Sequence, residues 1–259
     1  MIDLPTAATF SAVIADPRFI AGLAIAALAG IVRGFTGFGS ALIYIPLMSA
    51  VYGPLIAAPT FVIADVVTGL AFLSTTWRKA HWDEVLPMAA AAIIAAQFGT
   101  LVLQWAHPTT LRWALSVLVL SAVALLASGW RYHGKPKLIV TIAVGLLAGI
   151  LGGAVQISGP PIIVYWFGSG HGADILRANF FAYFSVFSMG SVVTYALHGL
   201  LTATVLALSL FITPTTLAMM AVGTKLFHLA KEGNYRPVGY IVAILSAIAS
   251  MPLFDGLLR

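Results

Sequence analysis

Uninterrupted apolar runs fill most of this sequence, and they constrain its fold more than any other feature. Hydrophobic residues make up 61% of the 259 residues and charged residues only 8%, against about 25% charged in an ordinary soluble domain. An apolar run of about 20 residues matches the thickness of the hydrocarbon core of a bilayer. The sequence therefore predicts an all-α polytopic membrane protein, with residues 1–259 forming a single integral membrane domain. We expect about eight hydrophobic segments, which cover residues 19–51, 54–76, 85–106, 110–130, 138–168, 175–198, 200–228 and 237–257.

The rest of the composition excludes several classes of protein. The sequence has no cysteine, which excludes disulfides, iron–sulfur clusters and thiolate metal sites. Its 13 Lys and Arg residues are spread thinly at segment ends and form no basic stripe, so nucleic acid is not an expected partner. The six histidines lie near segment ends and never pair at i, i+4, so we expect no metal site and no cofactor. The phosphate-binding pattern G-x-x-x-x-G-K-[ST] is absent from the sequence, which excludes ATP-driven transport by this chain alone.

The sequence contains an internal repeat. Residues 28–46 (LAGIVRGFTGFGSALIYIP) align with residues 147–165 (LAGILGGAVQISGPPIIVY) at an offset of 119, and a weaker match follows at an offset of 124. Both aligned stretches carry a Gly-rich interruption, and such paired interruptions in two halves point to the binding site of a transporter. We therefore expect two homologous halves, about 19–130 and 138–258, arranged as inverted repeats. The aligned pairs are Gly34 with Gly153, Ser40 with Gly159, and Gly99-Thr100 with Gly223-Thr224.

The first and fifth segments are too long for one span and too short for two. Segments 19–51 and 138–168 hold 33 and 31 residues. As helices they would be roughly 45–50 Å long, whereas the hydrocarbon core is about 30 Å thick. A segment that is broken at its Gly-rich centre and returns to its own side fits this length, and it would place both termini outside the cell. The distribution of Lys and Arg does not decide between returning and crossing once Arg177 and Lys225 are discounted.

The Gly-rich interruptions are the candidate binding site. Irregular backbone is tolerated at membrane depth only where protein or a water-filled cavity satisfies its polar groups. Free N–H groups in such turns, followed by a helix N-terminus, favour an anion. The alternative is close helix packing, because small residues at i and i+4 also let membrane helices approach each other. The candidate residues are Arg33, Gly34, Thr36, Gly37, Gly39 and Ser40 in the first interruption, and Gln156, Ser158, Gly159 and Pro160 in the second.

Charged residues inside the apolar segments add further candidates. A charge at the bilayer centre costs at least ~2.5–3.5 kcal/mol, so Arg33 and Asp65 each need a reason to lie there. Either Arg33 attracts an anion while Asp65 binds and releases a proton, or the two form a structural pair. Arg177 and Asn179 begin the sixth segment and are candidate binding residues, although an interfacial arginine is common at that position.

At these motifs the chain resembles the sulfite exporter TauE/SafE family, also called the toluene sulfonate uptake permease family. The stretches that carry the resemblance are RGFTGFGSALIYIP (33–46), GGAVQISGPPIIVYW (152–166) and RAN (177–179). Their order and spacing extend the resemblance over essentially the whole chain. The second stretch departs from the family pattern, because Gln156 and Ser158 stand where the family often has glycines. More side-chain hydrogen bonding is therefore available to a ligand there.

The resemblance implies a secondary transporter of small anions such as sulfite, sulfonates or related organic anions. It implies alternating access driven by a proton gradient or the membrane potential, in the cell inner membrane. The residues alone lead only to an anion-binding carrier with inverted repeats. The expected partners are a small anion, protons as a coupling ion and membrane lipid; whether the chain forms a homodimer stays open. The competing hypotheses are an anion channel, a membrane assembly factor without transport activity, and an intramembrane hydrolase that uses Ser158.

Overall fold

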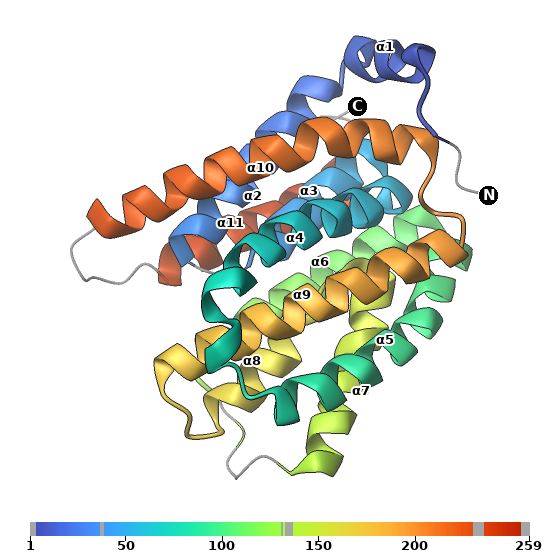
Figure 1. Cartoon of the computed structure of the whole chain (residues 1–259). Helices are drawn as coiled ribbons and strands as arrows, with labels where there is room; N and C mark the ends of the chain where they lie inside the picture. The colour runs from blue at the N-terminus through green and yellow to red at the C-terminus, as the bar shows by residue number, and fades with distance from the viewer. Residues whose placement is uncertain (1–3, 37–38, 131, 133–136, 230–235, 255–259) are drawn as a thin grey trace. The chain divides into compact units, whose positions relative to one another are not determined.

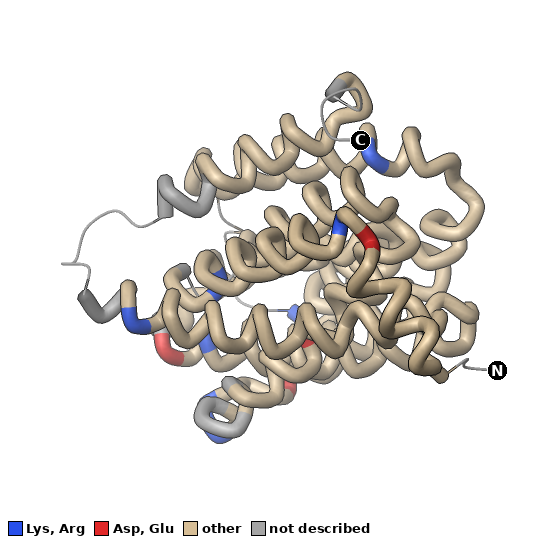
Figure 2. Tube along the Cα trace, turned by 90° about the horizontal axis from the view of Figure 1, so that it is seen from above, with Lys and Arg blue, Asp and Glu red and all other residues tan. Residues whose placement is uncertain are grey.

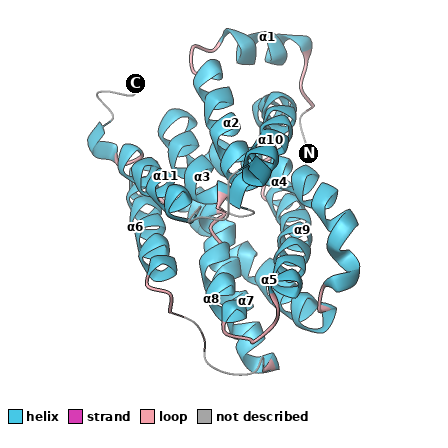
Figure 3. Ribbon diagram, turned by 90° about the vertical axis from the view of Figure 1, so that its left-hand side faces the viewer, coloured by secondary structure: helices cyan, strands magenta, loops and turns pink. Residues whose placement is uncertain are grey.

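The described residues form helices and no strand (Figures 1 and 3). The computed structural model describes all residues except 1–3, 37–38, 131, 133–136, 230–235 and 255–259. The predicted all-helical class is therefore confirmed. The helices are α1 (Ala7–Ala15), α2 (Phe19–Thr36), α3 (Ser40–Tyr52), α4 (Pro54–Thr76), α5 (Trp82–Trp105), α6 (Pro108–Ala127), α7 (Leu138–Val155), α8 (Gly159–Phe167), α9 (Ala173–Leu197), α10 (Ala203–Leu229) and α11 (Arg236–Ala249), with 3₁₀ turns η1 (Trp77–Lys79) and η2 (Pro252–Phe254).

Six helices in the described part of the chain are long and apolar enough to cross a membrane by themselves: α4, α5, α6, α7, α9 and α10. These six candidate spans are fewer than the eight predicted hydrophobic segments for two reasons. In the first predicted segment, α2 meets the criteria only together with α1, from which it is bent by 83°, and in the last segment α11 has only 14 residues. Figure 2 shows the few charged residues scattered between long uncharged helical stretches.

The chain divides into two compact units, each built from both sequence halves. Unit 1 comprises Met1–Ala64, Ala106–Val123 and Gly199–Arg259, and unit 2 comprises Asp65–Trp105 and Ala124–His198. In unit 1, α2 packs along α10, and in unit 2, α7 packs along α5 (Figure 1). Each unit thus joins a helix that precedes a Gly-rich interruption to a long helix from the other half.

Helices α2 and α3 fold back on each other as a hairpin. The Arg18 guanidinium, just before α2, lies 4.7 Å from the centre of the Tyr52 ring at the end of α3 and also donates to the Val51 carbonyl oxygen at 3.5 Å. A Cβ on Gly22 would meet the same Tyr52 ring at 3.3 Å. The end of α3 therefore lies beside the beginning of α2.

Helices α7 and α8 form a second hairpin. The hydroxyls of Thr141, near the start of α7, and Tyr165, near the end of α8, form a hydrogen bond at 2.5 Å. The backbone N–H of Tyr132, which precedes α7, donates to the Val164 carbonyl oxygen at 3.2 Å. In both hairpins the helix break coincides with the predicted Gly-rich interruption, because α2 ends at Thr36 and α7 ends at Val155.

Glycines bring the paired helices into backbone contact. A Cβ on Gly34 of α2 would overlap the Met220 carbonyl oxygen of α10, and a Cβ on Gly153 of α7 would overlap the Ala96 carbonyl oxygen of α5. Small residues allow this close approach between membrane helices. The close-packing alternative is thus confirmed for Gly34.

The two glycine contacts correspond under the sequence offsets. Gly153 follows Gly34 by 119 residues, and Met220 follows Ala96 by 124 residues. Two threonines repeat the correspondence: Thr100 Oγ1 donates to the Gly153 oxygen at 3.5 Å, and Thr224 Oγ1 donates to the Gly34 oxygen at 3.4 Å. The helix pairs α5–α7 and α10–α2 therefore share one packing register.

Candidate functional site

The interruption between α7 and α8 is fixed by a bridging tyrosine. Gln156 ends α7 with φ 55° and ψ 25°, in the left-handed region that side chains other than glycine seldom adopt. Its amide Nε2 donates to the Tyr195 hydroxyl at 3.0 Å, and that hydroxyl donates to the Gly153 carbonyl oxygen at 3.1 Å. Pro160 and Pro161 then lie in the first turn of α8, where a missing N–H removes no helical bond. The Tyr195 hydrogen bonds thus fix the backbone conformation at the break.

Ser158 places a buried hydroxyl at this break. It occupies the N-cap position of α8 but makes no capping bond with its side chain, and only 3% of the residue is exposed. Tyr183 of α9 is fully buried and lies close enough to interact with Ser158. Among the described residues, however, the Tyr183 hydroxyl has no partner with hydrogen-bond geometry. An unmade buried hydrogen bond costs about 1–3 kcal/mol, so a ligand oxygen would be favoured beside this hydroxyl.

Gly159 differs from the packing glycines. The nearest atom to a Cβ at this position would be Phe184 Cζ at 3.5 Å, which is an ordinary contact. Close packing therefore does not require a glycine there. The small residue leaves the backbone beside Ser158 free of a side chain.

Asp65 is buried against α9. The Ser188 hydroxyl donates to Asp65 Oδ2, and 5% of Asp65 is exposed. One turn earlier on α9, the buried Ser185 hydroxyl has no partner in the described part of the chain, and a Cβ on Gly69 would lie 2.9 Å from it. Asp65 belongs to unit 2 and Arg33 to unit 1, so their suggested pairing stays a prediction.

The first interruption brings Arg33 and Ser40 together. Arg33 is buried in the last turn of α2, where the helix dipole favours a cation, and its NH1 donates to Ser40 Oγ at 3.5 Å. Gly39 has φ 86° and a Cβ there would meet nothing within 4 Å. Gly37 and the side chain of Thr36 lie outside the described residues. The proposed ligand contacts of this interruption stay predictions.

Arg177 and Asn179 have different surroundings. Arg177 is exposed, with its guanidinium 5.6 Å from the centre of the Phe181 ring. Asn179 is fully buried; its Oδ1 accepts the His81 backbone N–H at 2.8 Å, and its Nδ2 has no partner among the described residues. The Asn179 amide N–H group thus has no partner among the described residues, whereas Arg177 is exposed.

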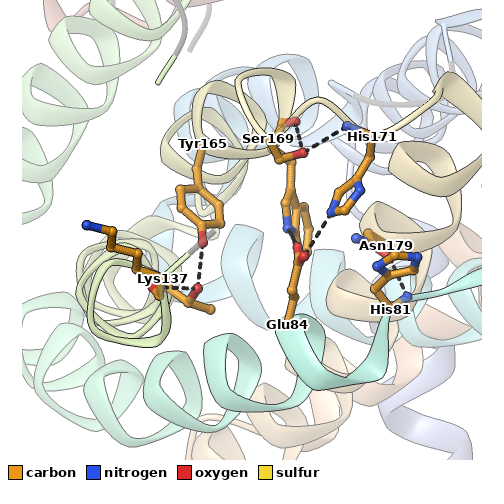
Figure 4. Close-up of polar contacts among 9 residues, drawn as sticks. His81, Glu84, Lys137, Tyr165, Ser169, His171 and Asn179 are labelled. Carbon is orange, nitrogen blue, oxygen red and sulfur yellow. Dashed lines mark hydrogen bonds and ion pairs between the residues drawn. The ribbon is translucent and has the colours of Figure 1, made fainter. Parts of the chain in front are cut away.

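Sequence reasoning missed two groups of residues. The first is a set of buried hydroxyls on α9, for which the only signal is a run of polar residues in an apolar segment: Tyr183, Ser185, Ser188 and Tyr195. The second is a cluster of His81, Glu84 and His171 at the start of α5 and in the loop before α9 (Figure 4). The two histidines are far apart in the sequence, so spacing rules gave no signal.

Comparison with known proteins gives one match. The family described as Sulfite exporter TauE/SafE matches residues 22–250, which is most of the chain. No curated protein and no solved structure matches the chain significantly. The matched region contains all of the α7–α8 hairpin, most of the α2–α3 hairpin and the whole of the buried polar set on α9.

Proposed function

Because the chain belongs to the sulfite exporter TauE/SafE family, we propose that it is a secondary carrier of sulfite, sulfonates or related small organosulfur anions. The family name and the six apolar helices make it a multi-pass membrane protein of a transporter family. The proposed location is the cell inner membrane. Transport by alternating access would move one anion between the two aqueous phases.

One observation carries the proposal: at the α7–α8 break, the buried Tyr183 hydroxyl has no partner among the described residues and lies near the buried hydroxyl of Ser158. The Tyr183 hydroxyl is buried without a partner, and the Ser158 hydroxyl does not cap α8. Ser158 is followed by Gly159, where a Cβ would make only ordinary contacts. Sulfur oxyanions present several acceptor oxygens, and hydrogen bonds to a charged group are stronger than neutral ones. In the proposed site these two hydroxyls donate to the anion.

The two halves form inverted repeats in this proposal, and both hairpins return to the side from which they enter. The matching registers of α5–α7 and α10–α2 support the repeat, and the fold-back contacts at Tyr52 and Tyr165 support the return. Because the chain has no cysteine, a single introduced cysteine reports one position. A membrane-impermeant maleimide should label Leu4→Cys and Leu55→Cys from the same side of the membrane. Labelling from opposite sides would contradict the returning hairpin.

Asp65 is the proposed proton acceptor. A buried carboxylate inside an apolar helix is costly and marks ion pathways in transporters. Asp65→Asn keeps an acceptor for Ser188 but cannot exchange a proton. In proteoliposomes we expect wild-type flux of labelled sulfite to saturate and to follow an imposed pH gradient. The variant should retain exchange at equal pH and lose gradient-driven accumulation; accumulation equal to wild type would remove Asp65 from the mechanism.

An anion channel and a hydrolase remain the alternatives. A channel would show flux that does not saturate and ignores the pH gradient. A serine hydrolase needs a base in reach of its nucleophile. His198 hydrogen-bonds to Gln97 and Gln104, and His171 hydrogen-bonds to Glu84. Neither of these interactions involves Ser158. Covalent labelling of Ser158 by a fluorophosphonate probe would favour the hydrolase.

A further inference from the structure

Three potential metal ligands meet at one end of unit 2. His81 and Glu84 flank the start of α5, and His171 lies in the loop between α8 and α9 (Figure 4). One ligand atom from each of the three lies within 4.8 Å of the other two. His171 Nε2 and Glu84 Oε1 are 2.8 Å apart, and the two imidazole rings meet edge to face, with centroids 4.6 Å apart and an interplanar angle of 65°. No other group of three or more such side chains was found in the described part of the chain.

Neighbouring groups already orient the carboxylate. The indole N–H of the fully buried Trp166 donates to Glu84 Oε2 at 2.8 Å, which leaves Oε1 turned toward His171. Outer partners of this kind fix the orientation of metal ligands and are worth 10–100-fold in metal affinity. Contacts within the protein thus give the Glu84 carboxylate a defined position.

The two histidines are positioned through their backbones. The His81 N–H donates to the buried Asn179 side chain at 2.8 Å, and the His81 carbonyl oxygen accepts the Glu84 N–H at 3.0 Å. The His171 N–H donates to Ser169 Oγ at 3.4 Å, and that hydroxyl donates to the Trp166 carbonyl oxygen at 2.7 Å. Trp166 thus positions Glu84 directly and His171 through Ser169, and Asn179 positions His81.

The ligand set favours a particular class of ion. Two imidazoles and one carboxylate suit Zn²⁺ and its neighbours among the divalent transition metals, whereas Mg²⁺ and Ca²⁺ prefer oxygen ligands. With metal–ligand distances of about 2.0–2.2 Å, tetrahedral ligands lie ~3.3 Å apart. The Glu84 and His171 atoms are 2.8 Å apart and all three ligand atoms lie within 4.8 Å of one another, which brackets this spacing.

The cluster is partly exposed. The side chains of His171 and Glu84 are 18% and 12% exposed, so the site is neither fully buried nor free on the surface. Three protein ligands leave one tetrahedral position open for water or an anion, unlike structural zinc sites with four protein ligands. Bound metal would tie the loop after α8 to the first turn of α5.

We propose that His81, Glu84 and His171 bind one divalent transition-metal ion, with Zn²⁺ the first candidate. The inference rests on the geometry of the cluster and does not depend on the transported substrate. It assigns to these histidines a role that their spacing in the sequence did not suggest.

Zinc titration of the purified full-length protein tests this inference. The protein should carry an affinity tag without histidine and should first be stripped with a chelator. Calorimetry should show one Zn²⁺ per chain, and Zn²⁺ should raise the apparent melting temperature. His171→Ala and Glu84→Gln should each weaken binding about 100-fold, whereas His107→Ala, at an exposed histidine outside the cluster, should bind as wild type does.

Two outcomes would overturn the proposal. One is wild-type protein that shows neither heat nor stabilisation on addition of Zn²⁺, since Glu84 and His171 would then form only a hydrogen bond. The other is stoichiometric binding that survives both substitutions, since the ion would then lie elsewhere. X-ray absorption at the zinc edge gives a second readout, in which two nitrogen ligands at about 2.0–2.1 Å are expected.

Discussion

Ser158→Ala is expected to reduce sulfite flux in proteoliposomes about tenfold or more, while the protein stays folded in the membrane. The substitution removes one hydroxyl that the proposed site directs at the anion. A hydrogen bond to a charged group contributes about 1.5–3 kcal/mol, and each 1.4 kcal/mol corresponds to a factor of ten. Because the Ser158 side chain does not cap α8, the fold should lose little stability. Tyr183→Phe should reduce flux to a similar extent.

Ser191→Ala is the matched control for these two variants. Ser191 is also buried on α9, and its hydroxyl also lacks a partner among the described residues, but it lies two turns beyond Tyr183. Its removal should leave flux within about twofold of wild type, as for a substitution that breaks no identified interaction. Wild-type flux in both Ser158→Ala and Tyr183→Phe would remove the anion site from the α7–α8 break.

Gly153→Ala is expected to cause a large loss of stability. The added Cβ would overlap the Ala96 carbonyl oxygen, and backbone cannot rotate away as a flexible side chain can. Overpacking of this kind costs typically 1–3 kcal/mol, so the apparent melting temperature should fall by roughly 2–12 °C. Displacement of α7 would also disturb the Tyr195 bridge to Gln156, so flux should fall as well. Thermal unfolding in detergent measures the first effect.

Two further glycine substitutions test whether close helix packing is the cause of the lost stability. Gly34→Ala should destabilise to a similar degree, because it places the same overlap between α2 and α10. Gly159→Ala should leave the melting temperature near that of wild type, because its Cβ would make only ordinary contacts. Equal melting temperatures for all three variants would show that the close glycine contacts do not hold the helices together.

The helices and their breaks could be predicted from the sequence because the signals are local. Apolar runs with the length of a membrane span gave the segments, and the length of segments 19–51 and 138–168 indicated a break in each. The offset between Gly34 and Gly153 indicates a repeated motif, and the packing contacts of these two glycines correspond under the two sequence offsets. The prediction of eight hydrophobic segments is not confirmed in that detail, because six helices in the described part of the chain meet the criteria for a span by themselves.

The roles of individual residues depended on contacts that the sequence does not encode locally. A Gly-x-x-x-Gly pattern is compatible both with close packing and with exposed backbone, and only the structure assigns Gly34 and Gly153 to packing and leaves Gly159 uncrowded. Tyr183 lies close to Ser158 because α9 passes the start of α8. His81 and His171 meet through a loop, so rules based on ligand spacing could not detect them.

Ligand-dependent stability of the purified protein tests the central claim, a site for small sulfur oxyanions, most directly. A ligand that binds only the native state stabilises it by about 2.7 kcal/mol at a concentration 100 times its Kd. Melting temperatures should be measured with sulfite, sulfate, taurine, sulfoacetate and matched carboxylates at equal ionic strength. The proposed site predicts a rise of several degrees with at least one sulfur anion, a smaller rise with its carboxylate counterpart, and a reduced rise in Ser158→Ala. No rise with any of the sulfur anions, or equal rises with the carboxylates, would contradict the claim.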